Sequence, residues 1–186
     1  MLPRMSVVKR LIQESTLGLL IMARSDDLPD VVAVADAPFM TTRGLPQDLI
    51  YLAMIESGFN PKARSPVRAS GLWQFMAATA HRFGLKVNGR VDERNNPERA
   101  TEAALAYLTY LHAKFGSWYL AAAAYNSGEG TVSKAMKRVT GRTKGTDADF
   151  YRIAPRLPRE TRDYVPKLIA AARIGNNPER YGFDAD

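Results

Sequence analysis

Glu56 ends the most apolar helical segment of the chain, residues 49–55. The residues three, four and seven positions before it are Ala53, Leu52 and Leu49. A helix over this segment therefore places Glu56 on its apolar face. Burial disfavours the charged form of a carboxyl group and raises its pKa above the usual ~4.3. A carboxyl group that stays protonated near neutral pH can act as a general acid.

The same position also allows a purely structural role. Glu56 would lie in the last turn of its helix, where a long side chain can turn into solvent or pair with Arg64 or Arg68. The nearest earlier carboxylate, Asp48, lies eight residues away on the same helix, at roughly 12 Å. The sequence therefore favours chemistry with one carboxylate, although Asp92 and Glu93 could approach through the fold.

An aromatic and an amide follow one another at Trp73 and Gln74. Aromatic rings stack on the apolar faces of sugars, and amides bond to hydroxyl and N-acetyl groups. Helical spacing places both residues in the first turns of a helix that starts near Ser70. The pair is compatible with a sugar site, but a Trp on a helix is more often a core residue and a Gln is more often solvent-facing.

Tyr125 and Asn126 follow four consecutive alanines, residues 121–124. Such small residues permit close helix packing, so this helix should be central, with its last residues emerging at the edge of the core. Asn126 could line a cleft there together with Glu56. It could equally be a helix cap beside Gly128.

The elements that must position these residues are all helical. Apolar spacing and end signals predict helices over about 46–57, 70–83, 97–115, 118–126, 132–139 and 160–174, with a kink at Pro166. An alternating pattern typical of a strand appears only over 31–34. With 186 residues, 46% of them hydrophobic, the chain is predicted to be one all-α domain.

The composition restricts the partners and the chemistry. A net charge of +7 favours an anionic partner, but the basic residues do not form the stripe of a nucleic-acid binder. Zero cysteines exclude thiolate chemistry, and His81 and His112 have no metal-ligand spacing. Residues 8–22 keep a loose amphipathic pattern and form no convincing export signal.

Several short motifs occur together in a specific order. They are Glu56-Ser57-Gly58, Ser65, Gly71-Leu72-Trp73-Gln74-Phe75-Met76, Ala124-Tyr125-Asn126-Ser127-Gly128 and Glu160-Thr161-Arg162-Asp163-Tyr164-Val165. In this conjunction the chain resembles the lytic murein transglycosylases of the goose-type-lysozyme-like superfamily, most closely the membrane-bound D type. The resemblance covers residues 44–175. It implies a single lysozyme-like helical domain with a substrate cleft, between an N-terminal extension of residues 1–43 and a tail of residues 176–186.

The resemblance also implies roles for individual residues. Glu56 matches the sole catalytic acid and base of the family, and Ser57 packs under the cleft. The implied substrate-binding residues are Ser65, Gln74, Met76, Tyr125, Asn126 and Tyr164. In the family the match of Ser65 contacts the N-acetyl group or the acid. The matches of Tyr125 and Asn126 line the glycan opposite the acid, and that of Tyr164 lies close to it.

The implied reaction cleaves the β-1,4 bond between N-acetylmuramic acid and N-acetylglucosamine without water and leaves 1,6-anhydromuramoyl ends. Glu56 would act first as the acid and then as the base, while the 2-acetamido group replaces a second carboxylate. No cofactor or metal is required.

Two alternatives remain compatible with the sequence: a muramidase that hydrolyses the same bond, and a catalytically silent glycan-binding module. The expected partners are peptidoglycan glycan strands, with no nucleic acid. The expected state is a monomer, and peripheral association with the envelope membrane is left open. No clear export signal indicates the location. The expected substrate indicates the periplasm or cell envelope.

Overall fold

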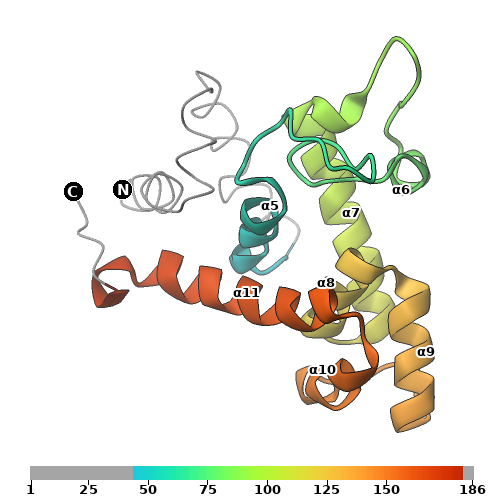
Figure 1. The fold of residues 1–186 in the computed structure, drawn as a ribbon, viewed down its shortest axis with the longest axis vertical. Helices are drawn as coiled ribbons and strands as arrows, with labels where there is room; N and C mark the ends of the chain where they lie inside the picture. The colour runs from blue at the N-terminus through green and yellow to red at the C-terminus, as the bar shows by residue number, and fades with distance from the viewer. Residues whose placement is uncertain (1–43, 182–186) are drawn as a thin grey trace. The chain divides into compact units, whose positions relative to one another are not determined.

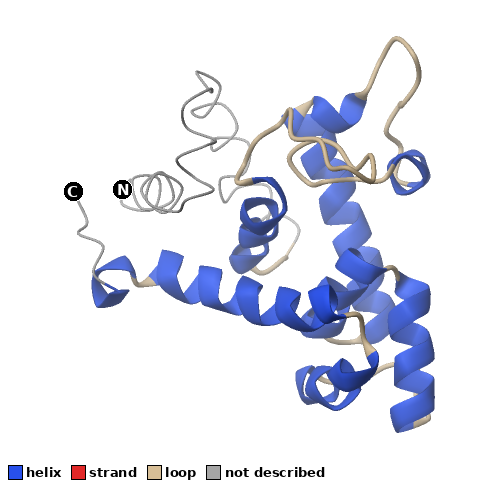
Figure 2. Cartoon of the chain, viewed as in Figure 1, coloured by secondary structure: helices blue, strands red, loops and turns tan. Residues whose placement is uncertain are grey.

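A computed structural model describes residues 44–181 of the chain (Figure 1). Within these residues the secondary structure is helical, and the few extended contacts are isolated bridges (Figure 2). The predicted all-α class is confirmed. The N-terminal extension 1–43, with the predicted helix over 8–22 and strand over 31–34, lies outside the described residues.

The α-helices are α5 (Ile50–Ser57), α6 (Ala77–Arg82), α7 (Pro97–Phe115), α8 (Trp118–Ser127), α9 (Glu129–Thr140), α10 (Asp147–Ile153) and α11 (Arg159–Asn176). Short 3-10 helices are η1 (Gln47–Leu49), η2 (Glu93–Asn95), η3 (Ala154–Arg156) and η4 (Pro178–Tyr181). In this described part of the chain, no helix has both the length and the apolar composition of a membrane span.

The chain divides into two compact units. Among the described residues, the first comprises residues 44–104 and 170–181, and the second comprises Leu105–Ile169. Helices α7 and α11 each have residues in both units.

In the first unit, the helix predicted over 46–57 is confirmed with one change at its start. Pro46 precedes the helix in an extended conformation, and the first turn is the 3-10 helix η1. Helix α5 follows directly and buries Tyr51, Leu52 and Ala53. It ends at Gly58, whose φ of 60° is the left-handed conformation that glycine adopts without steric cost.

The prediction of a helix from Ser70 is wrong, because α6 begins only at Ala77. The backbones of Ser70 and Phe75 exchange two hydrogen bonds of 3.2 Å, which close a tight turn between them. Gln74 within that turn has a φ of 48°, which no helix permits. This turn buries Leu72, Trp73 and Phe75, so the spacing of apolar residues in the sequence resembles that of a helix.

The prediction for α7 is confirmed at both ends. The Asn96 side chain accepts a 2.9 Å hydrogen bond from the backbone N–H of Arg99, which caps the first turn. The predicted stripe is buried along the whole helix, at Ala100, Ala103, Ala104, Tyr107, Leu108, Leu111 and Phe115. The helix ends at Gly116 with a φ of 74°.

In the second unit, α8 is the central helix, as the four alanines predict. Residues 121–124 are fully buried, and α8 packs against both α9 and α10. The Ser117 side chain caps the start of α8 by accepting from the N–H of Leu120 at 3.2 Å. Gly128 ends this helix and precedes α9, which stops at Gly141 as predicted.

Helix α10 was not predicted from the sequence. Thr146 and Asp149 form a capping box at its start, in which each side chain bonds to the backbone of the other residue. This Thr-x-x-Asp spacing is the signal that could have identified the helix. The segment that precedes this helix is also held in place, because the N–H of Gly145 donates to the carbonyl of Phe115 at 2.8 Å.

Helix α11 confirms the last predicted helix and includes Pro166. Its buried residues Thr161, Tyr164, Val165 and Leu168 recur at helical spacing. Pro166 itself is exposed and is not part of this buried face.

Candidate active site

Glu56 lies in the last turn of α5, and its side chain is half-buried. The helix buries Ala53 and Leu52 on the turn before it, which agrees with the predicted apolar face. The left-handed Gly58 ends the helix two residues later, so the carboxyl group lies at the C-terminal end of α5.

Ser57 ties this helix end to the turn at residues 70–76. Its hydroxyl points to the carbonyl of Leu72 at 2.7 Å and to that of Ala53 at 3.1 Å. The side chain is only 7% exposed. Ser57 is thus a buried residue that joins the end of α5 to this turn.

Gln74 is held by its backbone and its side chain alike. The amide nitrogen donates to the carbonyls of Gly71 at 2.8 Å and Ala63 at 3.2 Å. Because both partners are carbonyl oxygens, the side-chain atom that faces them must be the amide nitrogen Nε2. The amide oxygen Oε1 is therefore the atom that can accept a hydrogen bond from a ligand. The predicted place of Gln74 on a helix is wrong, because it lies in the turn instead.

Trp73 is a core residue and not a sugar platform. Its side chain is fully buried, and its indole N–H donates to the Thr101 hydroxyl at 2.9 Å. The neighbouring Met76, by contrast, is 46% exposed at the residue that precedes α6. The apolar surface available to a ligand on this segment is therefore that of Met76.

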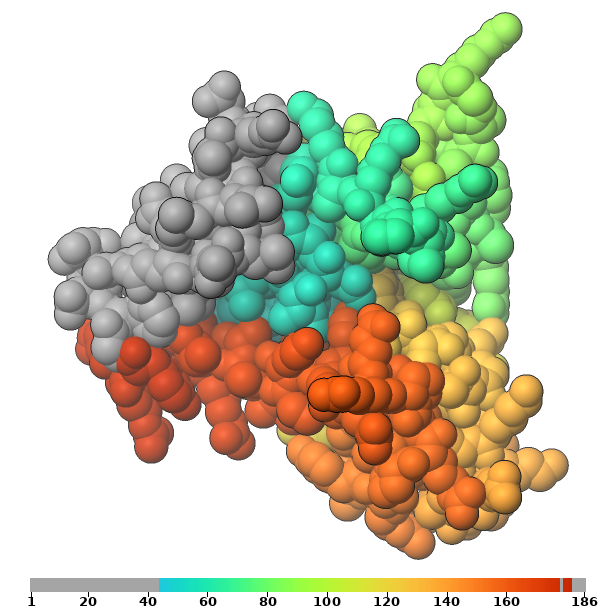
Figure 3. Space-filling view, in the orientation of Figure 1, coloured from blue at the N-terminus to red at the C-terminus, as the bar shows by residue number. Residues whose placement is uncertain are grey.

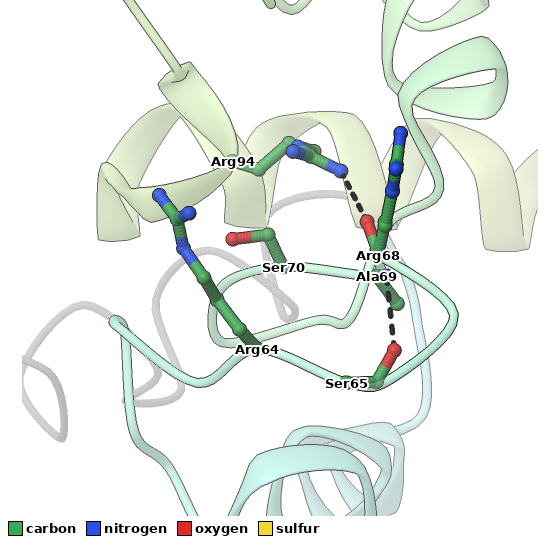
Figure 4. Close-up of a pocket in the computed structure, with 6 residues that line it drawn as sticks. All are labelled: Arg64, Ser65, Arg68, Ala69, Ser70 and Arg94. Carbon is green, nitrogen blue, oxygen red and sulfur yellow. Dashed lines mark hydrogen bonds between the residues drawn. The ribbon is translucent and has the colours of Figure 1, made fainter.

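Ser65 forms a small closed turn with Ala69. Its backbone N–H donates to the carbonyl of Ala69, and its hydroxyl accepts from the N–H of Ala69, both at 3.0 Å. The two residues line a pocket of about 280 Å³ (Figure 4). The other residues of its lining are Arg64, Arg68, Ser70 and Arg94.

Arg94 is a buried residue of this site that the sequence did not identify. It is 8% exposed, and it binds Asp92 through two hydrogen bonds of 2.8 and 2.7 Å. Its remaining terminal nitrogen donates to the carbonyls of Arg68 and Phe75. Arg94 therefore holds two parts of the loop between α5 and α6. No sequence signal marks it, because its partners lie 19 and 26 residues away.

Within residues 44–181, the carboxylates nearest to Glu56 in sequence have other partners. The hydrogen bond from Arg94, and its positive charge, keep the pKa of Asp92 below the ordinary value. Glu93 accepts from the backbone N–H of Lys86 at 2.7 Å, and Asp48 accepts from Asn176 at 2.7 Å. Each is thereby engaged in a structural contact.

Asn126 in the second unit connects α8 to α11. Its amide nitrogen donates to Glu160 at 3.1 Å, and its amide oxygen accepts from the hydroxyl of Thr161 at 2.8 Å. The alternative of a helix cap is wrong, since Gly128 occupies that position. The side chain is instead fixed by two polar groups of the neighbouring helix.

The other two predicted residues of this unit are aromatic. The Tyr125 ring lies 5.3 Å from that of Tyr107, and its side chain is half-buried. Tyr164 is 6% exposed and lies one helical turn after Thr161 on α11. Of the predicted residues, Tyr125, Asn126 and Tyr164 thus belong to the second unit, and Glu56, Ser65, Gln74 and Met76 belong to the first.

The described residues hold no group of three or more histidine, cysteine or acidic side chains that could bind a metal. His112 stacks on Trp118 with ring centroids 4.0 Å apart, and His81 is exposed on α6. Neither histidine therefore joins the predicted site residues in a metal cluster.

Comparison with known proteins gives consistent matches. The family model described as the transglycosylase SLT domain matches residues 39–147. The membrane-bound lytic murein transglycosylase D of Escherichia coli K12 is 42% identical over 141 residues, which are 75% of this chain and 30% of that protein. The soluble lytic murein transglycosylase of the same organism is 34% identical over 125 residues, covering 64% and 19% of the two chains.

A solved structure supports the same relationship. The crystal structure of the 70 kDa soluble lytic transglycosylase of Escherichia coli matches 99% of this chain and 30% of its own, with a TM-score of 0.64 and 26% identity. The chain thus spans about a third or less of the length of these relatives.

Proposed function

Because the chain belongs to the transglycosylase SLT domain family, we propose that it cleaves the glycan strands of peptidoglycan as a lytic transglycosylase. The family match over residues 39–147 carries this proposal, because that range includes Glu56 and the turn that holds Gln74. The half-buried position of Glu56 at the end of α5 supports a role as the general acid.

In the first step, the protonated Glu56 donates its proton to the oxygen between N-acetylmuramic acid and N-acetylglucosamine. The bond from that oxygen to the anomeric carbon of the muramic acid breaks, and the N-acetylglucosamine part leaves with the proton. The 2-acetamido oxygen stabilises the positive charge at the anomeric carbon, in the manner of substrate-assisted glycosidases.

In the second step, the ionised Glu56 removes the proton of the 6-hydroxyl group of the same muramic acid. The freed oxygen attacks the anomeric carbon and closes a 1,6-anhydro ring. The acetamido group is released, and Glu56 regains its proton. No water is consumed, and the single carboxyl group is used in both steps.

The neighbouring residues are proposed to bind the sugars. Gln74 offers its amide oxygen to an N-acetyl N–H or a hydroxyl group, since its nitrogen already binds two carbonyls. Met76 offers an exposed apolar surface, and Ser65 lines the pocket of about 280 Å³ described above. In the second unit, Tyr125, Asn126 and Tyr164 are proposed to contact the glycan.

The test is digestion of purified peptidoglycan, followed by mass analysis of the released fragments. A transglycosylase gives muramoyl ends that are lighter by one water molecule than hydrolysed ends. The variant Glu56→Gln keeps the size of the side chain but cannot transfer a proton, and it should give no fragments.

Each outcome decides between specific functions. Anhydro ends from the native chain, absent with Glu56→Gln, support the proposal. Reducing ends would identify a muramidase. Binding of peptidoglycan without any cleavage by the native chain would identify a glycan-binding module and overturn both enzymatic functions.

The proposed substrate also locates the protein. Peptidoglycan lies in the bacterial cell envelope, so the chain must reach the periplasm or the wall to act. We propose that it works there as a monomer. Fractionation of cells, with detection of the chain in the periplasmic and membrane fractions, tests the location.

A further inference from the structure

The loop pocket, lined by Arg64, Ser65, Arg68, Ala69, Ser70 and Arg94, is strongly basic. In Figure 4 the guanidinium groups of Arg64 and Arg68 stand on opposite sides, with Arg94 between them. Its volume of about 280 Å³ is slightly below that of typical small-molecule sites, which range from ~300 to 1,000 Å³. It therefore suits a small side group better than a whole disaccharide.

The charges of the pocket are unbalanced. The Asp92 carboxylate neutralises Arg94 through two hydrogen bonds. Arg64 and Arg68 are exposed, and within residues 44–181 neither forms an ion pair with a carboxylate. Three positive charges thus face one negative charge, and two guanidinium groups remain able to bind an anion.

The backbone beneath both exposed arginines is held in place. Arg64 forms a β-bridge with Ser70. Arg68 has a φ of 67°, which is uncommon for a residue other than glycine. Its N–H donates to the carbonyl of Ser65 at 2.9 Å, and its own carbonyl accepts from Arg94 at 3.0 Å. These bonds maintain the left-handed conformation and fix where the Arg68 side chain leaves the loop.

The segment that carries the pocket is accessible. In the space-filling view, long side chains project from the blue-green segment that follows α5 (Figure 3). The polar groups of the pocket wall include the hydroxyl of Ser70, which donates to Asn95 at 2.9 Å. An incoming carboxylate could therefore meet Arg64 and Arg68 without first breaking an ion pair.

We propose that this pocket binds a carboxylate carried by the peptide substituent of the muramic acid. The inference rests on the proposed function, because peptidoglycan sugars are themselves uncharged and their acidic groups lie on the lactyl-linked stem peptides. The lactyl group is attached at C3, next to the C2 acetamido group. A contact of Ser65 with that acetamido group would bring the substituent at C3 beside Arg64 and Arg68. Guanidinium groups bind carboxylates with two parallel hydrogen bonds.

The test compares the native chain with the double variant Arg64→Ala/Arg68→Asn. Asparagine tolerates the left-handed conformation of residue 68, so the loop should keep its shape. On peptide-bearing strands we expect a roughly tenfold higher KM and an unchanged kcat, as for the loss of a charge-assisted contact. The defect should shrink as salt is added.

The matched control removes two positive charges elsewhere. Arg90→Ala/Arg173→Ala changes the net charge equally at two exposed positions away from the pocket. It should leave KM unchanged. Arg68→Lys, which keeps the charge but not the planar fork, should give an intermediate defect.

Chemically modified substrates identify the source of the carboxylate. Amidation of the carboxyl groups of peptidoglycan should raise the KM of the native chain and abolish its difference from the double variant. Strands stripped of peptide by an amidase retain a lactyl carboxylate. If the double variant has a higher KM only on peptide-bearing strands, the stem peptide is the source of the carboxylate. If its KM rises equally on stripped strands, the contact belongs to the lactyl group and the peptide assignment is overturned.

A binding measurement separates this inference from the proposed function. The Glu56→Gln chain is titrated with a purified disaccharide tetrapeptide, with and without the two arginine changes. Weaker binding after these changes supports the pocket even if no strand is cleaved. Equal binding, or equal KM values on intact and amidated strands, would overturn it while leaving the cleavage reaction in place.

Discussion

The hydroxyl of Ser57 lies 2.7 Å from the carbonyl oxygen of Leu72, fifteen residues away in the sequence. This hydrogen bond joins the residue after Glu56 to the turn that carries Gln74. Both partners are buried, so the contact is shielded from water. It fixes the end of α5 against the turn, and both parts of the first-unit site depend on it.

Replacement of Ser57 by alanine should therefore lower stability and activity together. The variant leaves the buried Leu72 carbonyl without this donor, at a cost of about 1–3 kcal/mol. Urea unfolding measures the loss, and peptidoglycan cleavage should fall in parallel. Thr109→Ala removes a hydroxyl that bonds only within its own helix at an exposed position, and should change stability by less than about 0.5 kcal/mol.

Gly71 should be intolerant of any side chain. A Cβ at this position would lie 1.7 Å from the carbonyl oxygen of Arg94, and its φ is 84°. Gly71→Ala should therefore destabilise the chain by more than about 3 kcal/mol, or prevent folding. Gly84→Ala is the matched control, because its φ is 85° but nothing lies within 4 Å of an added Cβ. It should cost only about 1 kcal/mol, and equal losses in thermal unfolding would contradict the close approach at Gly71.

Exchange of Gln74 for glutamate should damage the turn without changing the size of the side chain. An ionised carboxylate cannot donate to the carbonyls of Gly71 and Ala63, so two hydrogen bonds are replaced by repulsion. We expect a stability loss of about 1–3 kcal/mol at neutral pH. Acidification should recover part of it, because a protonated carboxyl group regains one donor. Asn60→Asp makes the same change of charge at a side chain whose oxygen accepts from the Lys62 N–H at 2.9 Å, a bond that a carboxylate keeps, and should show no such recovery.

Asp149 should make the second unit sensitive to acid. The hydrogen bond from the Thr146 N–H, followed by contacts with Arg152 and Arg142, keeps the pKa of Asp149 below its ordinary 3.8. The unfolded chain therefore binds this proton more readily than the folded chain. The stabilisation is complete well above pH 3.8 and declines as the pH falls through the lowered pKa.

The variant Asp149→Asn measures this contribution. Its Tm should lie below that of the native chain at neutral pH, and the difference should diminish as the pH falls below the ordinary pKa. Asp163→Asn, at an exposed position of α11, is the control for a change of charge. A difference between native chain and Asp149→Asn that stays constant down to the acid transition would contradict the linkage.

Thr161 should position Asn126. Thr161→Val keeps the shape of the side chain but removes the donor that bonds to the Asn126 amide oxygen at 2.8 Å. If Asn126 binds glycan, KM should rise several-fold while kcat changes little, and stability should fall by about 1 kcal/mol. Thr131→Val is the control: it removes a hydroxyl that donates to the backbone carbonyl of Ser127, four residues earlier, and it should leave KM unchanged. An unaltered KM in Thr161→Val would argue against a binding role for Asn126.

The helices that the sequence predicts well are those with local signals at both ends. Helix α7 has a capping Asn96, a continuous buried stripe and a terminal Gly116, and each acts within a few residues. For residues 70–76 the sequence predicts a helix, whereas the structure has a turn. The apolar residues there are spaced as in a helix, so their spacing does not distinguish a helix from this turn. Its actual form depends on Arg94, which binds the carbonyl of Phe75 from nineteen residues away.

The sequence by itself determined the all-α class, the family and the place of Glu56 on a helix end, because these depend on local periodicity and on motif order. Only the tertiary structure decided that Trp73 is a core residue, and that Gln74 lies in a turn with a positive φ. It also decided that Arg64 and Arg68 border a pocket with Arg94. Hydrogen bonds and charges between residues distant in the chain produce these features, and no local pattern encodes such contacts.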